Sequence, residues 1–348
     1  MSRRFSKTRR LSTLVRLGTM LLAAAWGDGA RSSDGPQGER PASKPLAGVE
    51  RVVFVGDSIT YAGRYLEYVE AILRIHDPSI ECRFFNLGLP SETVSGLTEP
   101  GHADGKFPRP DLHERFERVL ERVRPQLVVA CYGMNDGIYH PYSDERFAKY
   151  RMGIESLRSK ALAAGARVIH LTPPVFDPVP ILDRTLPAGL DEYRKPFVGY
   201  DDVLALYSAW LIARRGNGWE VVDIHGPMRT ALDAQRATDP KFRFAGDGVH
   251  ADSAGHWLIA RQFLAHWGID SKDLREARSG EEYLASIPHG KEILSLVERG
   301  QRVRKDAYLR GIGHLRPGMA RGVEITEAER VSSEVDTEIR TLLNGPKK

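Results

Sequence analysis

Short apolar segments alternate with amphipathic ones through the middle of this chain, and this alternation constrains its fold more than any other feature. Five segments have the composition of β-strands, namely 51–55, 80–86, 126–131, 166–171 and 219–223. Their apolar residues are continuous rather than alternating, as is typical of parallel strands buried on both faces. The pattern predicts an α/β fold, a three-layer α/β/α arrangement around a parallel five-stranded sheet.

The segments between these strands carry helix signals. Asp111 and Glu114 have the spacing of a capping box, and an apolar stripe follows them until Pro125 ends the predicted helix. Apolar residues recur at helical spacing again in 147–161 and in 203–211. Helices between parallel strands are the crossovers that such a sheet requires, so both signals support the same fold.

Residues 271–348 predict a helical extension after the α/β domain, which we place at 49–270. Thr326 and Glu329 have capping-box spacing, apolar residues then share one helix face, and Gly345 is a stop signal. An apolar helix face must be buried, most simply against the α/β domain.

The first 30 residues predict an export signal. Six Lys/Arg residues accompany an apolar stretch at 17–26, and small residues follow it near 27–30. Paired arginines leave the twin-arginine route open, but their match is loose and the general secretory route is favoured. We therefore expect a signal peptide at 1–30, a flexible linker at 31–48, and a periplasmic or extracellular enzyme. A disordered basic arm is the alternative.

The basic pI of about 9.0 comes from that leader. The chain of 348 residues has a net charge of +4, and residues 1–30 alone carry +5, so the rest is at −1. A nearly neutral body gives no electrostatic reason to expect nucleic acid or an anionic membrane as partner. No run of 18 apolar residues indicates a membrane span. The two cysteines, Cys82 and Cys131, are expected to be buried free thiols.

Four short blocks of small and polar residues follow the predicted strands. They are 56–58 (GDS), 86–88 (NLG), 133–136 (GMND) and 247–250 (DGVH). Carboxyl ends of parallel strands meet at one edge of the sheet, and that edge holds the binding crevice of an α/β fold. A long loop at 88–110, rich in Gly and Pro, starts at the same edge, and loops of this length are usually functional or disordered.

The side chains of these blocks match the requirements of acyl transfer. Ser58 is the candidate nucleophile, His250 its base, and Asp247 the group that fixes the tautomer of His250. Asn135 can donate to the oxyanion through its side chain, and Gly88 through a backbone N–H that nothing shields. Ser58 can also donate its own N–H from a helix N-terminus, although a plain N-cap is an alternative role for this serine.

The blocks resemble those of the SGNH/GDSL hydrolases, a family named for Ser, Gly, Asn and His in four blocks. Ser58, Gly88, Asn135 and His250 match in order, over about residues 51–267. The resemblance implies the flavodoxin-like SGNH hydrolase fold, an esterase, lipase, thioesterase or carbohydrate acetylesterase activity, and the residue roles given above.

Two longer phrases, GLPSETVSGLTEPGHADGKFPRPDLHERF and ACYGMNDGIY, are similar to a subgroup of exported GDSL hydrolases from planctomycete-type bacteria. The family pattern does not cover the helical extension. Four residues are weaker candidates for substrate contact: Tyr61, Arg64, His102 and Asp104. We expect Asp57 and Asp136 to be structural and His256 to be a packing residue.

The most direct interpretation is a serine esterase that hydrolyses an oxygen ester through an acyl-enzyme. Export, a nearly neutral body and a polar loop favour a short acetyl ester on a small molecule or polysaccharide, with no cofactor, metal or protein partner. A lipase or thioesterase acting on lipid-like substrates and a non-catalytic glycan-binding module remain alternatives. A metal-dependent phosphoesterase is disfavoured, because a second metal-binding histidine is hard to place.

Overall fold

A computed structural model describes residues 46–187 and 194–345, so the expected signal peptide and most of the linker lie outside the described residues. Its five strands form one sheet: β1 (Arg51–Gly56), β2 (Arg83–Asn86), β3 (Leu127–Cys131), β4 (Arg167–Leu171) and β5 (Glu220–Val222). Each lies where the sequence predicts a strand. The strand order is β2-β1-β3-β4-β5 and every pairing is parallel, which confirms the flavodoxin-like arrangement.

The order of the strands determines where a site can form. The chain leaves β1 for the edge strand β2 and then returns past β1 to β3, so the direction of the connections reverses between β1 and β3. These two strands pair in register from Val52 with Leu127 to Gly56 with Cys131. A crevice opens at such a switch point, at the carboxyl ends of the strands.

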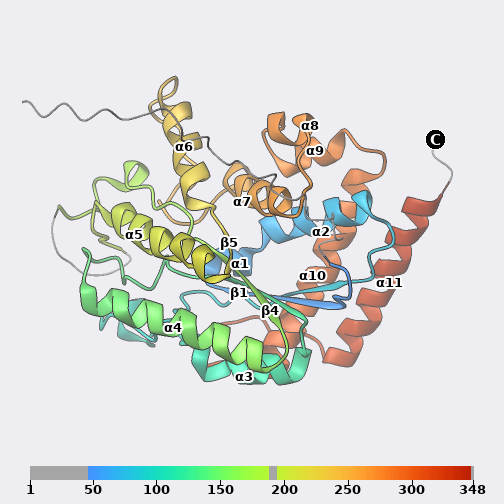
Figure 1. The fold of residues 1–348 in the computed structure, drawn as a ribbon, viewed down its shortest axis with the longest axis horizontal. Helices are drawn as coiled ribbons and strands as arrows, with labels where there is room; N and C mark the ends of the chain where they lie inside the picture. Colours follow the sequence, from blue (N-terminus) through green and yellow to red (C-terminus); the bar gives the residue numbers. More distant parts are fainter. Residues whose placement is uncertain (1–45, 188–193, 346–348) are drawn as a thin grey trace, which may run out of the picture. The chain divides into compact units, whose positions relative to one another are not determined.

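Helices cover both faces of the sheet (Figure 1). The α-helices of the α/β domain are α1 (Ser58–Ala62), α2 (Arg64–His76), α3 (Leu112–Val123), α4 (Asp144–Ala163), α5 (Tyr200–Ala213), α6 (His225–Arg236) and α7 (Ser253–His266). Short 3-10 turns occur at η1 (His102–Gly105), η2 (Val179–Ile181) and η3 (Arg214–Asn217). α2 and α7 pack together on one face, and α3 and α4 lie on the other. The three-layer α/β/α architecture is therefore confirmed.

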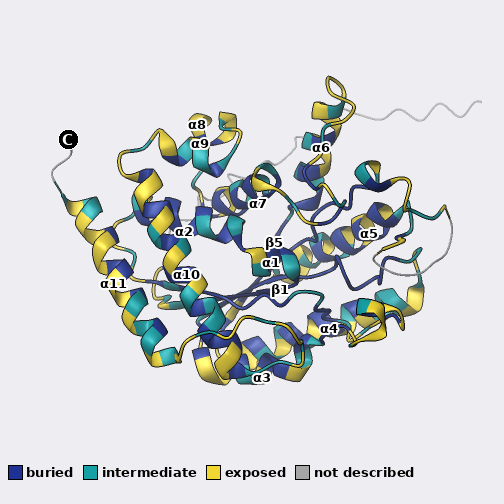
Figure 2. Cartoon of the chain, turned by 180° about the vertical axis from the view of Figure 1, so that it is seen from behind, coloured by how far each residue is buried: buried dark blue, intermediate teal, exposed yellow. Residues whose placement is uncertain are grey.

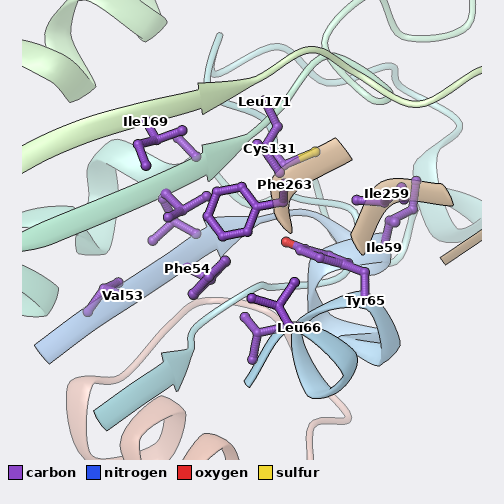
Figure 3. Close-up of a cluster of buried hydrophobic side chains, with 14 of the residues drawn as sticks. Val53, Phe54, Ile59, Tyr65, Leu66, Cys131, Ile169, Leu171, Ile259 and Phe263 are labelled. Atoms are coloured by element: carbon purple, nitrogen blue, oxygen red, sulfur yellow. The ribbon is translucent and has the colours of Figure 1, made fainter. Parts of the chain in front are cut away.

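The core between the sheet and the α2–α7 layer is aromatic and aliphatic (Figure 3). Phe54 of β1 contacts Phe263 of α7 edge to face, with ring centroids 5.8 Å apart, and Tyr65 of α2 at 6.2 Å. Cys131, at the end of β3, lies in the same cluster, and it and Cys82 are buried free thiols, as expected. Pairs of this kind stabilise a core by about 0.5–1.5 kcal/mol beyond the apolar area they bury. This packing fixes the strand ends on which the polar blocks stand.

The C-terminal extension is helical, as predicted, and lies beside the edge strand β2. It consists of α8 (Lys272–Glu276), α9 (Gly280–Ala285), α10 (Gly290–Ile312) and α11 (Ile325–Asn344). α10 packs on α2 and β2, and α11 packs on the outer side of α10 (Figures 1 and 2). Buried polar groups bind it to the domain: Arg304 donates to the Phe84 carbonyl at 2.6 Å, and Gln301 donates to Glu70 at 2.6 Å.

The predicted capping box of the last helix is wrong. α11 begins at Ile325 with Glu324 at its N-cap position, so Thr326 is already inside the helix. Glu329 instead accepts a hydrogen bond from the Tyr308 hydroxyl at 2.9 Å and pairs with Arg83. Contacts with α10 and β2 therefore outweigh the local capping signal. The capping residue Asp111 of α3 is confirmed, with its carboxylate accepting from His113 N at 2.9 Å.

Candidate active site

Ser58 is the first residue of α1, directly after β1, and it does not serve as the N-cap. Asp57 is the N-cap, and its carboxylate accepts a hydrogen bond from Ile59 N at 2.9 Å. The turn requires glycine at position 56, because a Cβ there would lie 2.2 Å from Thr60 Oγ1 and 2.7 Å from the Cys131 carbonyl oxygen. Since Asp57 fills the capping position, the hydroxyl of Ser58 is available for another partner.

That partner is His250. Its Nε2 lies 2.8 Å from Ser58 Oγ, and its Nδ1 lies 2.6 Å from Asp247 Oδ2. A carboxylate only accepts, so Nδ1 carries the proton in the neutral ring and Nε2 is left to accept from the Ser58 hydroxyl. Ser58 and His250 are 192 positions apart in the sequence, and the sheet edge brings them together.

The segment 247–250 holds the imidazole in place. Asp247 Oδ1 accepts from the backbone N–H groups of Val249 at 3.0 Å and His250 at 2.8 Å, while its other oxygen faces the ring. Gly248 has φ of +81°, and a Cβ there would lie 2.5 Å from the Asp177 carbonyl oxygen, so the turn needs glycine. Because Asp247 and His250 are three residues apart, one carboxylate both caps the turn through Oδ1 and orients the His250 ring through Oδ2.

The charges of this pair are mutually stabilised. The hydrogen bond from Asp247 raises the pKa of His250 above its ordinary 6.5, against the lowering effect of partial burial. Burial alone raises the pKa of Asp247, but hydrogen bonds from the His250 ring and from two backbone N–H groups outweigh it and hold that pKa well below its usual range. Asp247 is therefore ionised and favours an imidazolium at position 250.

Asn135 lies across the switch point, after β3. Its Oδ1 accepts from Arg109 Nη1 at 2.9 Å and from the Tyr139 hydroxyl at 3.1 Å, and its Nδ2 donates to the Glu92 carbonyl at 3.2 Å. Two donors on the oxygen fix which end of the amide is the NH₂ group. One proton of that group is used by Glu92, and the second remains to donate to a substrate oxygen.

The backbone donors differ from one another. No described residue accepts from the Ser58 N–H, as expected for the first residue of a helix. The Gly88 N–H, in contrast, donates to Asn86 Oδ1 at 3.1 Å in this structure. A Cβ at Gly88 would lie 2.3 Å from Tyr61 N, which explains glycine there by close packing against α1. Its role as an oxyanion donor stays a prediction.

Two buried ion pairs around Asn135 are functional candidates that the sequence analysis missed. Arg109 pairs with Glu99 through Nε at 2.6 Å and Nη2 at 2.7 Å, and Arg115 pairs with Glu92 at 2.6 Å. All four side chains are at most 2% exposed. Glu92, Glu99 and Arg109 belong to the loop 88–110, and Arg115 belongs to α3. Charged residues in a Gly- and Pro-rich loop are usually solvated, and the fold of this loop over α3 and the end of β3 buries these three. The length of that loop was the one sequence signal that pointed to them.

Asp57, Asp136 and His256 are structural, as expected. Asp136 Oδ1 accepts from the backbone N–H groups of Val94 and Ser95, both at 2.8 Å, and so anchors the start of the long loop. Burial raises the pKa of Asp57 to about 7 and that of Asp136 to about 6. The ring of His256 stacks on Tyr65, and burial lowers its pKa to about 4.

The four weaker candidates lie in different surroundings. Arg64 pairs with Glu281 at 2.6 Å, Glu67 at 3.0 Å and Glu298, so it connects α2 to the extension. These three carboxylates neutralise its guanidinium, which gives no support to a substrate contact. Tyr61 is half-buried beside α10, where Lys305 Nζ lies 4.1 Å from the centre of its ring.

His102 is buried, in contrast to a solvated loop histidine, with Nδ1 3.6 Å from Glu99 Oε1 and its ring edge-on to Phe107. It therefore packs beside Glu99, the partner of the Arg109 side chain that donates to Asn135. Asp104 lies at the surface, where it pairs with Lys106 at 3.3 Å and with Arg194.

Within the described residues, none of the helices combines the length and apolar character that a membrane crossing requires. In the same part of the chain, no three His, Cys, Asp or Glu side chains converge in a way that could hold a metal ion.

Comparison with known families agrees with this geometry. Residues 54–258 match the model of the GDSL-like lipase/acylhydrolase family, which is more than half of the chain. The chain belongs to this family. It is an enzyme that hydrolyses esters.

Individual relatives are distant. An acetylxylan esterase from Geobacillus stearothermophilus is 26% identical over 246 residues, which cover 64% of this chain and 95% of that protein. A crystal structure of an acetylxylan esterase from the same organism is 22% identical, with a TM-score of 0.43 over 64% of this chain and 95% of the other. A gut microbial diltiazem-metabolizing enzyme is 20% identical, with a TM-score of 0.47 over 64% of this chain, and this chain spans 48% of that one.

Proposed function

We propose that this protein is a serine esterase that removes short acyl groups, acetyl above all, from carbohydrates. The observation that carries the proposal is the continuous contact from Ser58 Oγ to His250 Nε2 at 2.8 Å and from His250 Nδ1 to Asp247 at 2.6 Å. A hydroxyl, a base and a carboxylate in this order are what nucleophilic acyl transfer requires.

The reaction proceeds in two steps. Ser58 Oγ attacks the ester carbonyl carbon while His250 Nε2 takes its proton, and Asp247 stabilises the resulting imidazolium. The tetrahedral oxyanion accepts hydrogen bonds from Asn135 Nδ2 and from the Ser58 N–H, with Gly88 N–H as a further expected donor. His250 then protonates the leaving alcohol. In the second step it activates water, which releases the acid from Ser58.

The choice of substrate rests on the sequence and on one relative. The acetylxylan esterase that matches this chain at 26% identity acts, by its name, on an acetylated polysaccharide. The chain's nearly neutral body, at −1 outside residues 1–30, favours a polar substrate over an anionic lipid surface. We also propose export after removal of 1–30, and membership of the planctomycete-type subgroup, from the leader and the two phrases quoted above.

Replacement of the nucleophile tests the mechanism. Ser58→Ala should lower kcat on p-nitrophenyl acetate by at least about 10⁴-fold. The thermal unfolding midpoint should not change, because Asp57 and not Ser58 caps α1. Ser333→Ala, on the exposed side of α11, is the matched control and should keep full activity. Full activity in Ser58→Ala would exclude the mechanism.

A substrate series tests the acyl group and the alcohol. Turnover of p-nitrophenyl esters should fall from acetate to butyrate to octanoate, and acetylated xylo-oligosaccharides should release acetate in the presence of EDTA. Faster turnover of octanoate would favour the lipase-type alternative. Loss of activity in EDTA would bring back a metal enzyme, and binding of acetylated glycans without acetate release would favour the glycan-binding module.

A further inference from the structure

The C-terminal extension contacts the long loop that begins at Gly88. Arg316, in the segment between α10 and α11, donates from Nε to the Pro90 carbonyl at 2.9 Å. Pro90 is two residues beyond Gly88. The guanidinium of Arg316 also lies over the ring of Phe107, 5.6 Å from its centre. One residue of the extension therefore touches both the beginning and the end of the long loop 88–110.

A second residue of the extension contacts α1 itself. Lys305 of α10 donates from Nζ to the Tyr61 carbonyl at 2.9 Å and lies 4.1 Å from the centre of the Tyr61 ring. This contact connects α10 with the end of α1. Because Tyr61 follows Ser58 by three positions in α1, the two residues lie on the same side of that helix. Tyr61 thus connects the nucleophile to the extension.

Lys305 and Arg316 differ from the paired cations of the extension in their partners. Neither Lys305 nor Arg316 forms an ion pair with a carboxylate of the described chain, and their donors are directed to carbonyl oxygens, a methionine sulfur and aromatic rings. On α11, in contrast, Arg330 pairs with Glu327 at 2.7 Å and with Glu334. Both Lys305 and Arg316 are half-buried, and burial lowers their pKa values.

Two carboxylates, Asp306 and Glu67, act on Lys305, and Asp306 also acts on Tyr61. Arg302 is a third cation that acts on Lys305 and Asp306, so the group around Tyr61 has three cations against two carboxylates, a net positive charge three positions from Ser58. Half-burying cations without carboxylate partners costs free energy, and an anion bound between them offsets this cost.

We propose that Tyr61, Lys305 and Arg316 form a subsite beside Ser58 that binds an anionic group, a carboxylate or a sulfate, on the sugar that carries the ester. The proposal rests on the proposed esterase function and specifies its substrate class. Tyr61 is only half-buried, so the part of its side chain that Lys305 does not cover supplies apolar surface for a sugar, and the two cations supply donors to the anion. The extension, outside the region matched by the family model, thereby contributes specificity.

Matched substrates test the subsite. The wild-type kcat/KM for acetylated methyl galacturonate, with a free carboxylate, should exceed that for the equally acetylated methyl galactoside by about tenfold, the size of one hydrogen bond to a charged group. The galactoside 6-sulfate tests sulfate in the same way. The preference should decrease when NaCl is raised from 0.05 to 0.5 M, because salt screens exposed charges.

Variants assign the preference to these residues. Lys305→Met with Arg316→Met should reduce the anionic-to-neutral ratio of kcat/KM to about one, through a higher KM for the anionic sugar. Lys305→Arg with Arg316→Lys should retain most of the ratio. Arg330→Met, which removes a paired cation of the same extension, is the control and should leave the ratio unchanged.

The outcomes separate the two proposals. A wild-type ratio near one, or a ratio that salt and the double methionine variant do not change, overturns the subsite. If the wild-type protein has no esterase activity, even on p-nitrophenyl acetate, the proposed function is overturned instead. The wild-type ratio and its salt dependence need no variant, so a folding defect in a variant leaves the proposal testable.

Discussion

The two halves of the candidate site are built in opposite ways. The proton-transfer half, Ser58 with His250 and Asp247, lies at the surface, and the last two side chains are 45% and 35% exposed. The oxyanion half, Asn135 with Arg109 and Glu99, is buried, and the side chains of that ion pair are 2% and 1% exposed. The proposed reaction therefore depends on a solvent-exposed group that titrates, His250, and on a buried amide held by hydrogen bonds, Asn135.

This difference has a physical reason. His250 must exchange protons with substrate and water, so access to solvent is part of its task. The Asn135 amide must face a developing charge without reorganising, and a low-dielectric setting makes its hydrogen bond stronger. Changes in the buried half should therefore lower kcat through geometry, while changes near His250 should shift the pH dependence.

The largest effect in the oxyanion half is expected at Asn135. Asn135→Ala should lower kcat by about 10²–10³-fold with little change in KM, because the donor acts on the transition state. Asn135→Asp keeps the oxygen that accepts from Arg109 but replaces the NH₂ donor, and it should be at least as damaging. Steady-state kinetics on p-nitrophenyl acetate measure both. A KM effect with unchanged kcat would remove Asn135 from the oxyanion site.

Loss of Arg109 should have an intermediate effect on rate and a large one on stability. Arg109→Met removes a charged donor from Asn135 Oδ1, which should lower kcat by about 10–100-fold. It also leaves Glu99 buried without its partner, at a cost of about 3–5 kcal/mol in the free energy of unfolding. Denaturant titration and kinetics at a temperature where the variant is folded measure the two effects.

A double variant separates these two effects. Adding Glu99→Gln to Arg109→Met removes the unpaired charge, so most of the stability should return while kcat stays low. If kcat recovers together with stability, Arg109 acts only on the fold and does not position Asn135.

The smallest effect is expected on the pH dependence of the exposed half. His250 must be neutral to take the Ser58 proton, and its pKa is raised above 6.5, so kcat/KM should fall as the pH drops through that raised value and level off above it. The charge of Asp57 contributes to this raised pKa. Burial raises the pKa of Asp57 to about 7, so only part of its charge is present where His250 titrates. Asp57→Asn keeps a capping side chain and removes that charge, so the fall of kcat/KM at low pH should move slightly to lower pH. If the pH dependence of kcat/KM does not change in Asp57→Asn, the charge of Asp57 does not act on His250.

The sequence predicted the parts of the site that short-range patterns encode. Asp247 and His250 are three residues apart, Ser58 follows a strand, and parallel strands end at one edge, so their meeting followed from the fold class. Arg109 and Asn135 are 26 positions apart and meet only because the long loop folds back over β3. No local spacing encodes that contact.

Contacts that sequence patterns do not show explain why one prediction was wrong and two were left without support. Thr326 lost its capping position because α11 is placed by its packing on α10. The Gly88 N–H is engaged by Asn86, two residues away, which pattern matching does not show. Arg64 was considered for substrate contact, but its partners Glu281 and Glu298 lie more than 200 positions later in the chain.

Covalent labelling of the nucleophile tests the central claim most directly. The purified protein is treated with a fluorophosphonate, which phosphonylates an activated serine with release of fluoride, and the modified peptide is located by mass spectrometry. The account predicts one label, on Ser58, formed in step with the loss of esterase activity and much more slowly in His250→Ala. An active enzyme that is inhibited with the label on another residue, or that stays active after Ser58 is fully labelled, would contradict it.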